Sequence, residues 1–231
     1  MMRNSNWRTS SERGPRRTNA DAVASYADPR TGQIAFALAD GIGEDGTAAR
    51  LAAAAAVRAA GDGAEAAMAA ARHAVEAAGT GDCVLVIAVP LPGEQGYEIA
   101  WVGDARAYAV VGDAVTQLTT DHTLAQYFRD RGTPATPRME HLVTASVRTA
   151  KPARIGYATV PTPAFLLLAS DGVHRYVDGR SFARVLHHAP DPAAELVRLA
   201  VREGSADNAT ALVVQCPPAL PATVAIPAAA A

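Results

Sequence analysis

Apolar residues alternate with smaller ones along residues 34–39, and this period of two predicts a β-strand with at least one buried face. The strand runs directly into Asp40, Gly41 and Gly43. A rigid strand would hold the carboxylate in place, and the glycines would let the backbone turn sharply and approach a ligand closely. Residues 34–46 therefore predict a binding site at the end of a buried strand.

The same arrangement recurs three times further along the chain. Asp104 and Asp171 each follow an apolar run, and Asp207 stands just before the last one. Carboxylates are the ligands that hard divalent cations prefer. Four aspartates at four strand ends, including Asp40, predict one metal cluster that the fold assembles from distant parts of the chain.

The remaining pattern predicts an α+β fold with mostly antiparallel sheets, because runs of strands and runs of helices are segregated. Residues 132–157 contain three prolines and no clear period, so we expect an irregular excursion that is functional or mobile. Asp121 is expected to cap the helix beginning near residue 120. Strands are predicted at 23–26, 84–89, 98–102, 106–111, 114–118, 165–169 and 210–215, and helices at 47–60, 62–78, 120–131, 179–188 and 192–203.

Composition narrows the class of protein. The 231 residues are 49% hydrophobic and 19% charged with a net charge of −2, which fits one globular domain and argues against a nucleic-acid or membrane-surface binder. Cys83 and Cys216 lie in apolar runs without metal-type spacing and are expected to be reduced core residues. No apolar run is long enough for a membrane-spanning helix, and the first residues lack a signal-peptide pattern, so we expect a cytoplasmic protein. We also expect a monomer.

Residues 1–11 are polar and rich in Ser and Arg, and they predict a flexible N-terminus. Residues 12–216 are expected to form the single folded domain. The Pro/Ala-rich residues 217–231 predict a disordered tail.

Six motifs, in order, resemble the metal-dependent serine/threonine protein phosphatases of type 2C, the PPM family, in their compact bacterial form. Each motif alone is a weak signal, but together they extend from residue 14 to residue 214. They are GPRRTNAD, ALADGIG, WVGDARAY, LTTDHTL, LASDGV and ADNATALVV.

The resemblance implies a four-layer α-β-β-α sandwich in which two antiparallel sheets are flanked by helix pairs. It also implies a site for two Mn²⁺ or Mg²⁺ ions at one end, with Asp40 bridging them and the Gly41 carbonyl completing one coordination shell. The other implied positions are Asp171 and Asp207 as ligands of the other ion, Asp21 at the metal–water shell, Asp104 at a third, weaker ion, and Arg16 as the phosphate-binding arginine.

The implied reaction is hydrolysis of phosphoserine and phosphothreonine in proteins by metal-bound water, without a phosphoenzyme. The expected partners are phosphorylated proteins, and the enzyme would oppose a Ser/Thr kinase in a bacterial signalling pathway. The leaving oxygen needs a proton. Ile42 stands where some family members have a histidine, so a metal-bound water is the expected donor, with His122 and His141 as further candidates.

The chain departs from the family pattern at several positions. Ala20 precedes the first aspartate where Glu or Gln is frequent, and Ala105 replaces a usual serine. These departures leave open a weakly active or inactive protein of the same fold that acts as a regulatory binding module. A metal-dependent hydrolase of small phosphorylated metabolites is a more distant alternative. Asp104 could also simply pair with Arg106.

Overall fold

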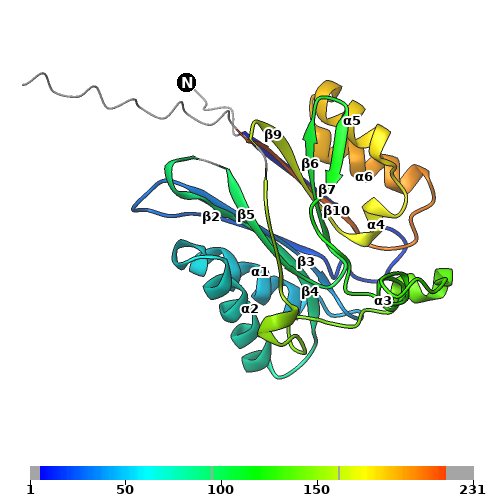
Figure 1. The fold of residues 1–231 in the computed structure, drawn as a ribbon, viewed down its shortest axis with the longest axis horizontal. Coiled ribbons are helices and arrows are strands. Elements are labelled where there is room, and N and C mark those ends of the chain that lie inside the picture. The colour runs from blue at the N-terminus through cyan, green and yellow to red at the C-terminus, as the bar shows by residue number, and fades with distance from the viewer. Residues whose placement is uncertain (1–5, 95, 161, 217–231) are drawn as a thin grey trace, which may run out of the picture.

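The computed structural model describes residues 6–94, 96–160 and 162–216. These residues form two antiparallel sheets of five strands each (Figure 1). In spatial order, sheet I contains β1 (Trp7–Glu12), β10 (Ala209–Cys216), β9 (Ala164–Ala169), β6 (Arg106–Val111) and β7 (Ala114–Gln117). Sheet II contains β2 (Ala22–Ala27), β3 (Ile34–Gly41), β4 (Cys83–Pro90), β5 (Tyr97–Val102) and β8 (Gly156–Thr159).

Helices cover the outer face of each sheet. On sheet II lie α1 (Thr47–Ala59) and α2 (Ala64–Ala78), and on sheet I lie α4 (Asp171–His174), α5 (Gly179–His188) and α6 (Pro192–Arg202) (Figure 1). Short 3₁₀ turns are η1 (Ala60–Asp62), η2 (Pro92–Glu94), η3 (Pro137–His141) and η4 (Pro152–Arg154). The expected four-layer sandwich is confirmed.

The alternation along β3 explains how a strand can be buried on both faces. Phe36 and Leu38 point into the core between the sheets. Ala35, Ala37 and Ala39 point the other way, into the core beneath α1 and α2. The two faces therefore carry large and small side chains respectively, as a period of two requires.

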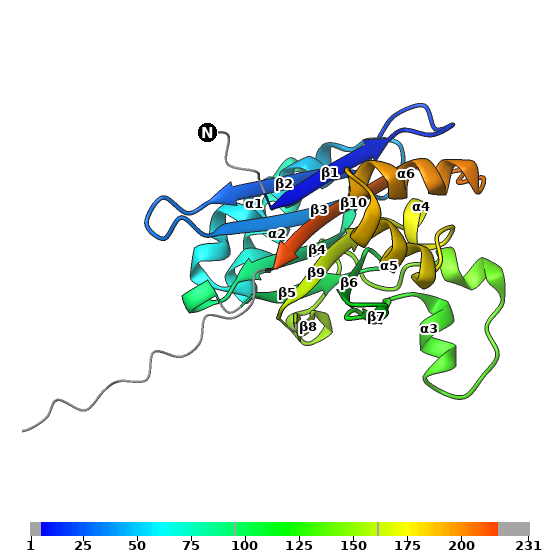
Figure 2. The same ribbon diagram turned by 90° about the horizontal axis from the view of Figure 1, so that it is seen from above.

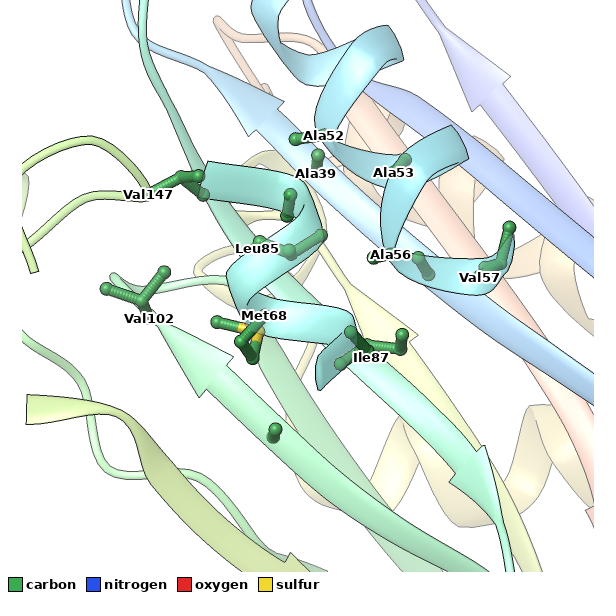
Figure 3. Packing of buried hydrophobic residues seen from close by; sticks show 14 of the residues in the cluster. Ala39, Ala52, Ala53, Ala56, Val57, Met68, Leu85, Ile87, Val102 and Val147 are labelled. Atoms are coloured by element: carbon green, nitrogen blue, oxygen red, sulfur yellow. The ribbon is translucent and has the colours of Figure 1, made fainter. Parts of the chain in front are cut away.

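Alanine dominates the contact between the helices and sheet II. Ala52, Ala53 and Ala56 of α1 are buried near Leu85 and Ile87 of β4 (Figure 3). Because a methyl group is the smallest apolar side chain, it allows a helix to approach a sheet closely while still excluding water. The alanine-rich stretches of the sequence are thus explained by tight layering.

The prediction of a flexible N-terminus over residues 1–11 is wrong for its second half. Residues 7–12 form β1, which pairs antiparallel with β10 from Trp7↔Val214 to Glu12↔Ala209. Trp7 also packs edge-on against Phe36, with ring centroids 5.4 Å apart. Residues 1–5 and the predicted disordered tail at 217–231 lie outside the described residues.

The helix predicted at 120–131 is shorter than expected. α3 spans Leu124–Arg129, and its N-cap is Thr123, whose side chain accepts a hydrogen bond from the Gln126 amide. The predicted cap Asp121 instead receives two hydrogen bonds from Arg106, at 2.8 and 2.6 Å. The Asp121 carboxylate therefore forms an ion pair with Arg106 and does not cap the helix as the local pattern predicts.

Cys83 and Cys216 are free and buried, as predicted. Across the described ranges, the structure contains no helix that is both long and apolar enough to cross a membrane. The β1–β2 connection, α3 and α4 all lie toward one end of the sandwich, whereas the β2–β3 hairpin lies at the other (Figure 2). The predicted site residues belong to the first of these ends.

Candidate metal centre

Strand pairing brings four of the predicted aspartates to one end of the sandwich. Asp21 immediately precedes β2, and the pair Ala22↔Ala39 places it beside Asp40 at the end of β3. Asp171 follows β9 and Asp207 precedes β10, and these two strands are antiparallel neighbours. In each sheet, therefore, the end of one strand lies beside the beginning of its antiparallel neighbour: β3 beside β2, and β9 beside β10.

Arg16 lies on the exposed β1–β2 connection and reaches the same place. Its Nη2 atom donates to Oδ2 of Asp207 at 2.6 Å. The connection is held by Asn208, which accepts from the Ala20 amide at 2.7 Å and donates to the carbonyls of Arg13 and Thr18 at 2.8 and 2.9 Å. Asn208 thus fixes the loop that carries the predicted phosphate-binding arginine.

Asp21 is 8% exposed, and neither carboxylate oxygen has a hydrogen-bond partner among the described residues. Burial raises its pKa from 3.8 to about 6. Nearby hydroxyls of Ser170 and Thr210 oppose this rise in pKa, although neither makes a hydrogen bond of normal geometry to the carboxylate. A buried carboxylate with both oxygens unpartnered is costly unless it has a ligand.

Asp40 interacts electrostatically with each of the other four predicted aspartates. Part of its surface remains accessible, yet protein atoms surround it densely, and this burial raises its pKa well above the usual value. Neighbouring carboxylates raise the pKa further, in decreasing order of effect: Asp21, Asp171, Asp104 and Asp207. All five aspartates therefore lie close enough to interact.

Gly41 follows Asp40 at a position where only glycine fits. A Cβ atom placed on it would lie 2.8 Å from the Ala20 carbonyl oxygen and 3.0 Å from the Ala20 Cβ. Both distances are shorter than van der Waals contact. The chain before β2 and the end of β3 can therefore approach each other this closely only because Gly41 has no side chain.

Asp104 is 4% exposed, and its main chain and its side chain are contacted by the last residue of α4 and by the C-cap residue that follows it. Nε2 of His174 lies 2.9 Å from its backbone oxygen, and Nη2 of Arg175 donates to its Oδ2 at 2.8 Å. Burial nevertheless raises the pKa of Asp104 to about 6. Asp104 does not pair with Arg106, which binds Asp121 instead.

Sequence reasoning missed Arg175. Besides Asp104, it contacts Asp171, with Nε 3.3 Å from Oδ2. Its position four residues after Asp171 was the available signal, because residues at i and i+4 share a helix face. What the sequence could not show is that Asp104, 71 residues earlier, binds the same guanidinium group.

The two histidines considered as proton donors are both engaged with protein groups. Nδ1 of His122 accepts from the Gly103 amide at 3.1 Å, and its ring stacks on Trp101. Nδ1 of His141 lies 2.6 Å from Nη1 of Arg175. The hydrogen bond and the ring contact hold the His122 side chain in place, and proton donation by either histidine stays a prediction.

The residues at this end fit a hard divalent cation by their chemistry. Within the described parts of the chain, no three His, Cys, Asp or Glu side chains are arranged to hold one ion as they stand. Arg16 and Arg175 pair with three of the carboxylates, whereas both oxygens of Asp21 have no partner. The ligand roles of the aspartates and of Gly41 therefore stay predictions, supported by this concentration of carboxylates.

No protein-family model matches the sequence. A curated Mycoplasma pneumoniae protein, provisionally named a protein phosphatase, is 30% identical over 136 residues, covering 54% of this chain and 52% of that protein. The chain thus spans about half the length of this relative.

Solved structures show the fold clearly. The PPM Ser-Thr phosphatase MsPP from Mycobacterium smegmatis, in complex with cacodylate, is 25% identical with a TM-score of 0.68, covering 90% of this chain and 97% of that one. The catalytic domain of the serine/threonine protein phosphatase PstP, in complex with two manganese ions, is 24% identical with a TM-score of 0.72, covering 90% and 96%. The expected resemblance is confirmed: this chain has the fold of the PPM-type serine/threonine phosphatases.

Proposed function

We propose that this chain is a metal-dependent phosphatase that hydrolyses phosphoserine and phosphothreonine in proteins. The observation that carries the proposal is the convergence of four aspartates around Asp40, with Arg16 beside Asp207 at the rim. The solved PPM-type phosphatases of the same fold support it, since one of them binds two manganese ions. Manganese or magnesium is the expected metal, with two ions per chain.

The aspartates would hold the ions by the roles that the sequence predicts. Asp40 would bridge the two ions, with the Gly41 carbonyl on one side and Asp171 and Asp207 on the other, while Asp21 would contact the water around them. Bound divalent cations supply an activated water and offset the charge of the phosphoryl group. Converging carboxylates repel by about 4 kcal/mol per pair at 4 Å and an effective dielectric of 20, which favours cation binding.

Arg16 would bind the phosphoryl oxygens of the substrate. Its side chain is 51% exposed and already bonded to a carboxylate, and a guanidinium group can hold two phosphate oxygens at once. An exposed arginine at the rim of the site, on a loop fixed by Asn208, suits a substrate that is itself a protein side chain. The expected substrates are phosphoproteins of a bacterial Ser/Thr kinase, in the cytoplasm, with the enzyme acting as a monomer.

The test is hydrolysis of p-nitrophenyl phosphate and of a phosphothreonine peptide with Mn²⁺ and with EDTA. Wild type is expected to hydrolyse both only with metal, and Asp40→Asn is expected to lose at least about 100-fold in kcat/KM. The matched control is Asp113→Asn, which changes an exposed aspartate of the β6–β7 turn and should leave the rate unchanged.

Three results would argue against the proposal. A folded wild type that is inactive with Mn²⁺ and shows no metal-dependent thermal shift would favour the regulatory module. Activity on phosphorylated metabolites but not on the phosphopeptide would favour a small-molecule hydrolase. An equal loss of kcat/KM in Asp40→Asn and Asp113→Asn would show that the active site is not at Asp40.

A further inference from the structure

We propose that Arg175 is a positioning residue that provides the positive charge at Asp104 from within the protein, so that no third cation is held there. The inference rests on the proposed function, and it differs from the expectation that Asp104 helps to hold a third ion.

Arg175 contacts Asp104 and a second carboxylate of the candidate site. Nη2 donates to Oδ2 of Asp104 at 2.8 Å, and the other end of the guanidinium group, Nε, lies 3.3 Å from Oδ2 of Asp171. The Arg175 side chain is 17% exposed and that of Asp104 is 6% exposed. Little water therefore reaches the pair, and a guanidinium group does not lose its proton at physiological pH.

His174 fixes the backbone at the same point. It is buried, and its Nε2 atom lies 2.9 Å from the Asp104 carbonyl oxygen. The last residue of α4 and its C-cap, Arg175, thus hold the main chain and the side chain of Asp104. A metal ion could bind Oδ2 of Asp104 only after Arg175 had moved away, because Nη2 of Arg175 already lies 2.8 Å from that oxygen.

Arg175 also binds the chain segment that contains η3. Nη2 donates to the Glu140 carbonyl at 2.8 Å, and Nη1 lies 2.6 Å from Nδ1 of His141. Arg129 of α3 pairs with the Glu140 side chain, which ties the segment to the helix before it. One guanidinium group thus bridges two site carboxylates and the irregular excursion, so a cation bound at Asp104 would release residues 137–141.

The test is the number of Mn²⁺ ions bound per chain, measured by isothermal titration calorimetry with MnCl₂ alone. Arg175→Met is expected to bind one more ion than wild type, and the double variant Arg175→Met/Asp104→Asn is expected to return to the wild-type number. The control is Arg198→Met, because Arg198 pairs with Glu195 on the exposed face of α6 and should leave the number unchanged. Equal stoichiometry in wild type and Arg175→Met would overturn the inference.

A second measurement decides the matter if Arg175→Met does not fold. Asp104→Asn keeps an oxygen that can accept from Arg175, so it should fold and bind as many ions as wild type. Loss of one ion in Asp104→Asn would show that Asp104 is a ligand and would overturn the inference.

Hydrogen exchange supplies a readout that does not depend on ion counting. Amides of residues 138–141 are expected to exchange faster in Arg175→Met than in Arg198→Met, with or without Mn²⁺. Unchanged protection would contradict the bridging role.

Failure of the proposed function has a different signature. A wild type that binds no Mn²⁺ would overturn the phosphatase, whereas the gain of an ion in Arg175→Met relative to wild type tests the role of Arg175 alone.

Discussion

Replacing Asp21 by asparagine should stabilise the protein in EDTA and weaken its response to metal. In the folded protein, burial raises the Asp21 pKa from 3.8 to about 6. The folded state therefore binds this proton more tightly than the unfolded chain does. The resulting stability is complete below about pH 4 and is lost as the pH rises through 6.

The magnitude follows from the shift in pKa. About two pKa units at roughly 1.4 kcal/mol each give an upper limit near 3 kcal/mol between pH 4 and pH 7.5. Asparagine carries no charge and avoids this loss, although its buried amide must find partners, at a cost of roughly 1 kcal/mol. A net gain of about 2 kcal/mol at pH 7.5 corresponds to a rise in Tm of roughly 4–8 °C for a domain of this size.

Thermal unfolding of wild type and Asp21→Asn, at pH 4.5 and 7.5 with EDTA, provides the measurement. The two proteins should differ little at the lower pH, and the variant should be the more stable at the higher pH. Mn²⁺ should raise the Tm of wild type more than that of the variant. A wild type that gains stability from pH 4.5 to 7.5, or a variant that is less stable than wild type at pH 7.5, would refute the reasoning.

Two further predictions concern packing around the site. Gly172→Ala should cost about 3 kcal/mol or more in the free energy of unfolding, because its Cβ would lie 2.0 Å from the backbone oxygen of Asn208, just before β10. Gly179→Ala, whose Cβ would lie 3.7 Å from the nearest atom, should be neutral or slightly stabilising. Urea denaturation compares the two variants, and equal effects would contradict the geometry. Arg106→Met should destabilise by roughly 3–5 kcal/mol because it leaves the Asp121 carboxylate buried without its partner. Arg30→Met breaks a pair whose arginine is largely exposed, so it should change stability little in the same assay.

The sequence predicted those elements whose pattern is local. The alternation along residues 34–39 identified β3 because both faces of that strand are buried, and the Asp-Gly pair at its end marked the site. The alanine-rich helices were equally clear, since the intervening Gly61 and Gly63 separate two long runs of good helix formers.

The features that the sequence did not reveal depend on contacts between distant residues. β1 is polar and looks like a loop, and only its pairing with β10 makes it a strand. Asp121 has the pattern of a helix cap, but Arg106, folded beside it, binds it more strongly. Arg175 gave a weak i,i+4 signal toward Asp171, while its bond to Asp104 exists only in the folded protein.

The hydrogen bonds of Asn208 have a consequence for the order in which this protein is assembled during synthesis. Asn208 holds the β1–β2 connection through residues that precede it by 188 to 195 positions. A nascent chain that has not yet reached β10 lacks both Asp207 and the side chain that shapes the loop around Arg16. Since chains fold from the N-terminus as they emerge, the helices and most of sheet II can form first. The ability to bind phosphate would then appear only with the last strand, so an incompletely synthesised chain would be folded in part and yet inert toward phosphoproteins.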